Sequence, residues 1–358
     1  MRVDLGSLFG KKKLPLVGLD ISTSAVKMVE LAEGGKNDMR LVRCATEPLP
    51  KGAIVDGNIE NIEQVAEAIR KVWKKSGATS KHVAIGLPSA SVITKQITLP
   101  GGLHEDELEV QVESEASQYI PFALEEVSLD FDVIGPSPNA EDEIEVMLAA
   151  ARKEKVEDRV AVAEAAGLMP TVMDIETYAA RAAIERITSR FPQASGKIIA
   201  LFNIGSAVTH ISVLLDGKPL YEREQPFGGK QLTQDIARAY GLTQEDAEMR
   251  KKAGNLPEGY ESEVLALFLE NASLEITRAL QFFFTSTPYN RVDHLFLSGG
   301  SAIVPGLADA VASRSGVATS VVSPFQGMQL SRGIREKQLN LEGPGYLVAC
   351  GLAMRRFD

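Results

Sequence analysis

LVGLDISTSAVKMVEL, at residues 16–31, carries the clearest structural signal in the chain. It predicts a buried strand that ends at Asp20, a turn of small hydroxyl residues, and a second strand rich in β-branched residues. ALFNIGSAVTHISVLL, at residues 200–215, repeats this plan, with Asn203 in the place of Asp20 and a turn that begins at Gly205. Because one such hairpin stands in each half of the chain, we expect a duplicated domain with a cleft between the two copies.

The composition is that of a globular protein without the charge of a nucleic-acid binder. At 358 residues the chain is long enough for two or more domains, and 44% apolar with 24% charged residues excludes a disordered chain. A net charge of −10 argues against nucleic acid as a partner. No apolar run approaches the ~18 residues of a membrane span, and the first residues are too short in their apolar part for a signal peptide. We therefore expect a cytoplasmic protein, in which Cys44 and Cys350 are free thiols.

The segments after each hairpin predict two similar halves. After the first hairpin we expect a strand at residues 41–46, a helix at 61–75 and a strand at 82–87, and this β-β-β-α-β order is typical of one ribonuclease H-like domain. The second half opens at residue 197 with its own hairpin, followed by a third strand and several helices. The expected fold class is therefore α/β, with two ribonuclease H-like domains.

A segment of different character interrupts the first half. Residues 92–152 predict three strands and a strongly acidic helix at residues 105–119. A helix at 153–167 follows, and residues 171–175 then predict one more central strand of the first domain. We expect the first domain at 1–85 and 168–196, the inserted subdomain at 86–167, the second domain at 197–230 and 288–358, and a helical subdomain at 231–287.

The turns of both hairpins suit an anionic ligand. A turn of small residues leaves backbone N–H groups pointing outward as an anion cradle, and two such turns would hold a triphosphate from both sides. Asp20 would then lie near a phosphate-bound Mg²⁺, which prefers one or two carboxylates plus water. Gly299 and Gly300 follow a predicted strand and let a base or a phosphate approach the backbone closely.

Glu248 and Lys251 lie three residues apart on one predicted helix face. This spacing fits a surface ion pair worth about 0.2–0.5 kcal/mol. It also fits a polar contact with a ribose and a base, and the sequence leaves both readings open.

Several stretches together indicate a family. They are GLDISTSAVKMVEL, GLPSASVITKQITLP, EASQYIPF followed by LDFDVIG, FGGKQLTQDIAR, and LEITRALQFFF. The paired hairpins, the Gly-Gly turn and the AExxK helix resemble the phosphate-1, phosphate-2, adenosine and ribose elements of the actin-like ATPase superfamily. The insert is placed as in the cell-division protein FtsA, and as a set the stretches are similar to the PilM family of type IV pilus assembly proteins. The resemblance implies an actin-like fold with an FtsA-type insert and a central cleft for ATP and Mg²⁺.

The resemblance also implies a role for each matching position. Asp20 would face Mg²⁺ through water, and Glu176 would orient the water that attacks the nucleotide. The first phosphate loop would comprise Gly18, Asp20, Ser22, Thr23 and Ser24. The second phosphate loop would comprise Asn203, Gly205, Ser206 and Thr209. The adenosine and ribose side would comprise Gly228, Lys230, Glu248, Lys251, Gly299, Gly300 and Ser301.

Asn203 departs from the pattern of the wider superfamily, whose active members carry an acidic residue at this position. A neutral amide cannot act as a general base and interacts less strongly with Mg²⁺ and its waters. ATP binding is therefore better supported than hydrolysis, which is expected to be weak or absent. Glu176 leaves slow hydrolysis open, so the sequence does not decide whether the protein is an enzyme.

The family resemblance implies a cytoplasmic, ATP-loaded platform of the pilus assembly complex. It would recruit the short N-terminal cytoplasmic tail of an inner-membrane protein of the PilN type, in a groove between the first domain and the insert. The membrane would be reached only through this partner. Contacts with pilus motor ATPases and a homo-oligomer are further expectations.

Two other functions fit the same fold less well. An FtsA-like polymerising ATPase of cell division would end in an amphipathic membrane helix beyond a linker. Here the sequence stops at residue 358, directly after an expected closing helix at 346–355. A sugar kinase would need an aspartate general base, and Asn203 offers no carboxylate.

Overall fold

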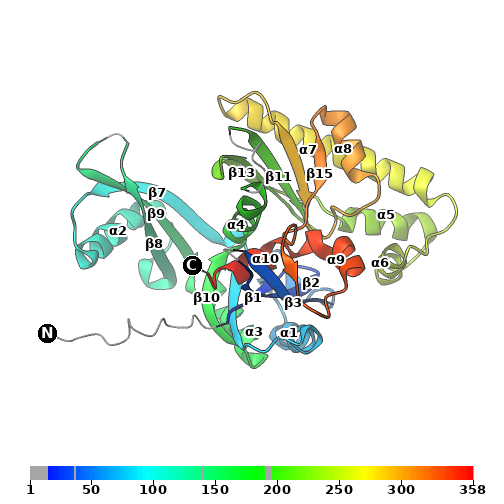
Figure 1. The fold of residues 1–358 in the computed structure, drawn as a ribbon, viewed down its shortest axis with the longest axis horizontal. Coiled ribbons are helices and arrows are strands. Elements are labelled where there is room, and N and C mark those ends of the chain that lie inside the picture. The colour runs from blue at the N-terminus through cyan, green and yellow to red at the C-terminus, as the bar shows by residue number, and fades with distance from the viewer. Residues whose placement is uncertain (1–14, 36–37, 139, 190–195, 358) are drawn as a thin grey trace.

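The protein consists of two large α/β halves and a small lobe that stands apart (Figure 1). The computed structural model describes residues 15–35, 38–138, 140–189 and 196–357. Each large half is built on one sheet, and the small lobe holds a third sheet of three strands. Among the described residues, none of the helices has the length and apolarity needed to cross a bilayer.

The first half is a six-stranded sheet in the order β10-β6-β1-β2-β3-β16. The hairpin predicted at residues 16–31 is confirmed, because β1 pairs antiparallel with β2 and parallel with β6. One face packs on α1 and α3 around a common apolar core. The strands are β1 (Val17–Ile21), β2 (Ala25–Glu33), β3 (Met39–Pro48), β6 (His82–Leu87), β10 (Met169–Ile175) and β16 (Gln329–Leu330), and the helices are α1 (Ile62–Ser76) and α3 (Lys153–Ala165).

The second half repeats this plan in a five-stranded sheet, β13-β12-β11-β14-β15. Its hairpin joins β11 and β12 in antiparallel register, as predicted for residues 200–215. Helices α5, α6, α7 and α8 pack with this sheet in the largest apolar core. The strands are β11 (Ile198–Ile204), β12 (Thr209–Leu215), β13 (Lys218–Gln225), β14 (His294–Ser298) and β15 (Thr319–Val321), and the helices are α5 (Lys230–Tyr240), α6 (Gln244–Ala253), α7 (Ala266–Ser286) and α8 (Leu307–Ser315).

Two helices fill the space between the sheets, α4 (Glu176–Thr188) and α10 (Leu347–Met354). These two helices cross at close range. A Cβ atom at Gly351 would lie 1.8 Å from the backbone oxygen of Ala179, so only glycine allows this approach. The other face of α10 lies on β1, where a Cβ atom at Gly18 would lie 2.0 Å from the Ala349 oxygen. The two halves are therefore joined through tightly packed backbone.

The small lobe is the predicted insert. It is a sheet of order β7-β9-β8 with α2 packed on it, and its apolar core is separate from those of the two halves. Its elements are β7 (Val92–Pro100), α2 (Glu105–Tyr119), β8 (Val127–Pro136) and β9 (Glu143–Arg152). Helix α3, which the sequence analysis grouped with the insert, packs instead with the first half, because Val162 and Ala163 are buried in that core. The domain boundaries as a whole stay a prediction.

Some short elements carried no sequence signal. These are β4 (Ile54–Val55), β5 (Asn58–Ile59) and α9 (Glu336–Glu342). The helix expected at residues 261–284 is present, but it begins with a π-helical turn at Glu261–Leu265 before α7. Strand β16 was also missed, and it brings a segment of the second half to the edge of the first sheet beside β3.

Candidate functional site

The first hairpin turn is largely exposed and is held by a few backbone and hydroxyl hydrogen bonds. The backbone N–H and the hydroxyl of Ser22 both donate to the Ala25 oxygen, at 3.1 and 2.9 Å. Thr23 and Ser24 are exposed. The backbone oxygen of Ser24 accepts a hydrogen bond from the N–H of Leu49 at 3.0 Å, which ties the turn to the next segment. The turn keeps the small, hydroxyl-rich surface that the sequence predicted for an anion cradle.

Asp20 lies directly beneath this turn. Its side chain is almost fully buried, and its Oδ2 accepts a hydrogen bond from the Lys27 ammonium at 2.9 Å. The two residues face each other across the antiparallel pair of β1 and β2. A single buried carboxylate with a compensating cation is compatible with Mg²⁺ held mainly through water, because that ion needs only one or two protein carboxylates.

The second hairpin turn is fixed by the start of α5. The N–H of Gly205 donates to the Val208 oxygen at 2.9 Å, which closes the turn. The N–H groups of Gly229 and Lys230 donate in turn to the oxygens of Gly205 and Ser206, at 3.0 and 2.8 Å. A Cβ atom at Gly228 would lie 2.5 Å from the Ser206 oxygen, so this glycine is required by close packing.

The Gly-Gly segment after β14 closes on the same turn. Gly299 has a φ of +91°, and a Cβ atom there would lie 2.4 Å from the Ile204 oxygen and 2.7 Å from Oδ1 of Asn203. The Ser301 hydroxyl donates to the Gly205 oxygen at 2.8 Å. At Gly300, by contrast, a Cβ atom would meet none of the described atoms within 4 Å. Gly299 is thus needed by the fold, whereas Gly300 borders open space that a ligand can use.

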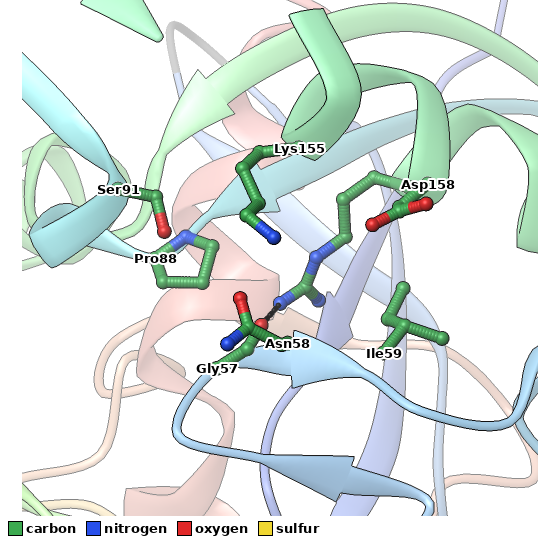
Figure 2. Close-up of a pocket in the computed structure, with 8 residues that line it drawn as sticks. Gly57, Asn58, Ile59, Pro88, Ser91, Lys155 and Asp158 are labelled. Carbon is green, nitrogen blue, oxygen red and sulfur yellow. Dashed lines mark hydrogen bonds between the residues drawn. The ribbon is translucent and has the colours of Figure 1, made fainter. Parts of the chain in front are cut away.

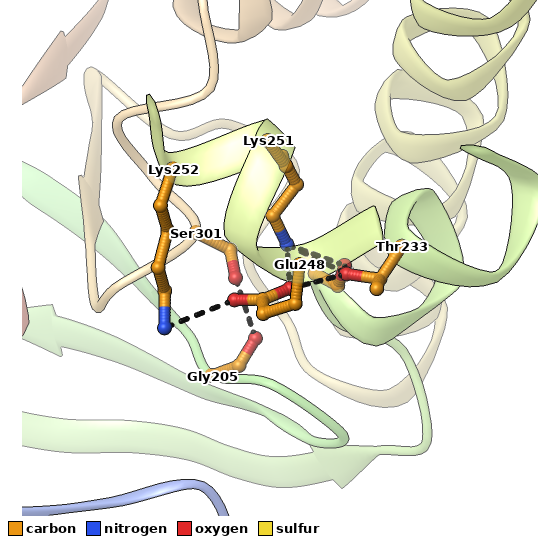
Figure 3. A network of polar contacts seen from close by, with 7 residues as sticks. Gly205, Thr233, Glu248, Lys251, Lys252 and Ser301 are labelled. Carbon is orange, nitrogen blue, oxygen red and sulfur yellow. Dashed lines mark hydrogen bonds and ion pairs between the residues drawn. The ribbon is translucent and has the colours of Figure 1, made fainter. Parts of the chain in front are cut away.

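Glu248 and Lys251 form a network with Thr233 on the facing helix α5 (Figure 3). The two charged groups are 2.6 Å apart, and the Thr233 hydroxyl lies 2.5 Å from Glu248 and 2.7 Å from Lys251. Lys252 approaches Glu248 from the solvent side at 3.2 Å. Although burial acts against it, the ammonium of Lys251 lowers the pKa of Glu248 to about 2. The pair is more than a solitary surface ion pair, because it ties α6 to the start of α5 beside the second turn.

Glu176, Asn203 and His210 meet in one small cavity between the halves. Glu176 begins α4, while Asn203 and His210 come from the second hairpin. The cavity has a volume of about 10 Å³, about the room of one water molecule. Its other lining residues are Thr177, Ala180, Leu201, Ser212 and Val348.

The charge state of Glu176 is set by this enclosure. Burial, followed by the negative charge of Asp20, raises the pKa of Glu176 to about 7. The cations of Arg159, His210 and Lys27 act in the opposite direction. A carboxyl group with a pKa near neutrality is suited to general-base work at physiological pH.

His210 was not predicted from the sequence. Its Nδ1 lies 3.1 Å from Oε1 of Glu224 on β13. Burial disfavours the imidazolium, but Glu224 and Glu176 outweigh that effect and raise the pKa of His210. The signal that could have found it is register: His210 is the cross-strand partner of Asn203, as Lys27 is of Asp20.

Three further predicted residues also have structural tasks. Gly18 lies within buried β1, where α10 leaves no room for a side chain. The Thr209 hydroxyl donates to the Phe227 oxygen at 2.7 Å and holds the segment before α5. The Lys230 side chain is exposed, and its backbone N–H binds Ser206. Their contact with a ligand stays a prediction.

Comparison with known proteins agrees with this architecture. A family model described as type IV pilus assembly protein PilM matches residues 18–357. The structure is similar to that of a PilM–PilN type IV pilus biogenesis complex, with 29% sequence identity, a TM-score of 0.80, and 97% of this chain and 99% of that chain covered.

More distant proteins share only the fold or a short stretch of sequence with this chain. The ethanolamine utilization protein EutJ of Carboxydothermus hydrogenoformans has a TM-score of 0.56 at 15% identity, over 94% of this chain and 88% of that chain, which shows a common fold. The cell division protein FtsA of Enterococcus faecalis is 35% identical over 75 residues, which are 20% of this chain and 17% of that protein. The actin-like fold that the family resemblance implied is thus confirmed, and the chain belongs to the PilM family of type IV pilus assembly proteins.

Proposed function

We propose that the protein binds one nucleotide between its two hairpin turns and serves as a platform in type IV pilus assembly. The observation that carries the first part is the matched placement of Asp20 and Asn203, each at the end of a strand that leads into a turn of small residues, with Glu176 in electrostatic reach of Asp20 and in one cavity with Asn203. Family membership carries the second part.

The residues present fit a Mg²⁺-bound ATP. The first turn would hold phosphates from one side, with Ser22, Thr23 and Ser24, and the second turn would hold them from the other. The space beside Gly300 would take the base, and Glu248 with Lys251 would bind ribose hydroxyls. Mg²⁺, when bound, would neutralise phosphate charge next to Asp20.

Hydrolysis by this site would be slow. Glu176 is the one carboxyl group of the small cavity, and its pKa of about 7 lets it accept a proton from a water held there. Asn203 cannot also act as a general base, because its amide has no basic form at physiological pH. We therefore propose nucleotide as a long-lived ligand that stabilises the closed arrangement of the halves.

Calorimetric titration of the full chain with Mg·ATP tests nucleotide binding. We expect one site per chain, with affinity lowered when EDTA removes the metal. A chain that shows no heat and no rise in melting temperature at millimolar Mg·ATP would contradict the proposal.

We further propose that the partner is an inner-membrane protein of the PilN type, which would place this chain at the membrane only through that partner. The similar PilM, at 29% identity over nearly the whole length, was solved as a complex with PilN. The tail would lie in an extended conformation between the first half and the insert, with backbone hydrogen bonds and side-chain pockets giving affinity and specificity. Contacts with motor ATPases and self-association stay predictions.

A pull-down with the cytoplasmic tail of the cognate PilN-like protein tests this role. Deletion of about the first ten residues of the tail should abolish binding. Full affinity of the shortened tail would reject this docking mode while leaving nucleotide binding untouched.

A further inference from the structure

The insert joins the first half through two short connections. One runs from the end of β6 through the 3₁₀ turn Ser89–Ser91 into β7, and the other runs from β9 directly into α3. The insert has an apolar core of its own, separate from those of the two halves. Its orientation therefore depends on the contacts that hold these two connections. We call residues 88–91 the insert root.

On one side the insert root lies against the first half. Pro88 and Ser91 border a cavity of about 10 Å³, about the volume of one water molecule. Lys155 and Asp158, at the start of α3, line the same cavity (Figure 2). Pro88 also lies close to the turn between β4 and β5, because a Cβ atom at Gly57 would lie 3.4 Å from its Cγ. These contacts keep the insert root on the first half.

On its other side the insert root is tied to residues around the cavity that holds Glu176. The Ser89 hydroxyl donates to Oγ1 of Thr177 at 3.1 Å, and Thr177 lines that cavity. The backbone N–H of Ala90 donates to the carboxylate of Glu224 on β13. The first N–H groups of a helical turn have no acceptor within the turn, and Glu224 supplies one. The insert root therefore touches both halves of the molecule.

Glu224 belongs to the second half and holds two groups at once. It is the cross-strand partner of His210, and its Oε1 lies 3.1 Å from Nδ1 of that residue. The hydrogen bond with His210 lowers the pKa of Glu224, so the group is a carboxylate that can accept from both His210 and Ala90. Strand β12, which pairs with β13, begins at Thr209 directly after the second hairpin turn. A movement of that turn therefore carries Glu224 with it.

We propose that Glu224 is a positioning residue that couples nucleotide binding to the orientation of the insert. The inference rests on the proposed function, in which nucleotide stabilises the closed arrangement of the halves. In that arrangement Glu224 reaches Ala90, so both halves hold the insert root. When the halves separate, this hydrogen bond is lost, and the insert takes up a wider range of orientations. By reciprocity, an insert held in this orientation favours the closed arrangement and tightens nucleotide binding.

The test is the distance between spin labels on the insert and on the second half, measured by double electron–electron resonance in the full chain. Ser114→Cys on α2 and Ser286→Cys on α7 place the labels at two exposed serines. The native thiols react poorly with the label, because burial raises the pKa of Cys44 to about 11 and that of Cys350 to about 12. We expect Mg·ATP to narrow the distribution of distances in the labelled protein.

Two variants assign the effect to Glu224. Glu224→Ala should abolish the narrowing, because Ala90 loses its acceptor on the second half. Glu222→Ala is the matched control: Glu222 lies two residues away on the same face of β13, and it approaches Arg181 on α4 at 4.0 Å. The control removes the same charge and should narrow as the labelled protein does. Equal loss of narrowing in both variants would overturn the link through Ala90.

The outcomes separate this proposal from the proposed function. Narrowing in Glu224→Ala overturns the coupling, as does an unchanged distribution in the labelled protein when calorimetry shows that Mg·ATP binds. Both results leave the proposed function intact, whereas a protein that does not bind Mg·ATP overturns both proposals. If Glu224→Ala does not fold, hydrogen exchange of the unmodified protein decides. The amide of Ala90 should exchange more slowly with Mg·ATP, and unchanged exchange there would overturn the coupling.

Discussion

The two hairpin turns are equivalent in sequence position but differ in how they are held. The second turn, residues 205–208, is enclosed by backbone: Gly228 and Gly229 lie against it, and Gly299 lies against Ile204 directly before it. The first turn, residues 22–24, is exposed and is positioned from below by charged side chains, with Lys27 on Asp20 and Arg159 on Ile21. One side of the site is therefore set by packing and the other by electrostatics.

This difference assigns separate tasks to the two sides. Tightly packed backbone cannot adopt another arrangement without a large cost in free energy. The second turn is therefore a preformed part of the proposed binding site. The strength of charged contacts changes with bound ligand, metal and pH. We therefore expect the nucleotide and the partner to change the conformation of the first turn. The predictions below test this division.

The largest effect is expected at Gly299. Replacing Gly299 with alanine would force a positive φ on a side chain and press its Cβ against Ile204 and Asn203. We expect a loss of about 3 kcal/mol or more in the free energy of unfolding, and loss of nucleotide binding. Denaturant unfolding, followed by circular dichroism, measures the loss of stability.

Gly300→Ala is the matched control at the next position, where a Cβ atom meets no described atom within 4 Å. It should leave stability within about 0.5 kcal/mol of the unmodified protein, yet weaken nucleotide binding if the base lies against this glycine. Equal stability of the two variants would show that the second turn is not set by packing.

Glu176→Gln should stabilise the protein at high pH. The folded-state pKa of about 7 lies above the ordinary value of 4.5, so the folded state holds a proton that the unfolded state releases between these values. Stability therefore falls as pH rises from about 4.5 to about 7, by on the order of 3 kcal/mol. The glutamine variant avoids this loss and should melt higher than the unmodified protein at pH 8 but not at pH 4.5. Parallel melting curves across that range would contradict the assignment.

Asp20→Asn tests the electrostatic side. Loss of the carboxylate should weaken Mg·ATP binding by about 2 kcal/mol, or roughly thirtyfold. In EDTA the two proteins should bind ATP about equally, because the metal no longer distinguishes them. A similar loss in both conditions would show that Asp20 acts on the fold and not through Mg²⁺.

The smallest effect is expected in the network of α5 and α6. Thr233→Val removes the hydroxyl that bridges Glu248 and Lys251, and should cost about 1 kcal/mol of stability. Lys252→Ala is the control, because Lys252 is largely exposed and such ion pairs contribute about 0–1 kcal/mol. Thermal unfolding of both variants would show whether the Thr233 hydroxyl contributes more to stability than the charge of Lys252.

Sequence patterns were sufficient for the elements with strong periodicity. The duplicated hairpin and the helix at 61–75 follow from apolar spacing, and Asn61 caps that helix by accepting a hydrogen bond from Gln64 at 3.0 Å. Strand β16 and helix α9 were missed because short segments held by tertiary packing leave no periodic signal.

The candidate site was only partly visible in the sequence. Motif resemblance found the turns, but not the cations around them. Lys27 and His210 follow from cross-strand register once the hairpins are aligned. Arg159 does not, because 138 residues of chain separate it from the Ile21 oxygen that it binds, and only the fold brings the two together.

A crystal structure of the full chain with Mg²⁺ and a slowly hydrolysed ATP analogue tests the central claim most directly. The account predicts phosphates between residues 22–24 and 205–207, the metal beside Asp20, and the base against Gly300. An analogue bound elsewhere, or phosphates in contact with only one of the two turns, would contradict it.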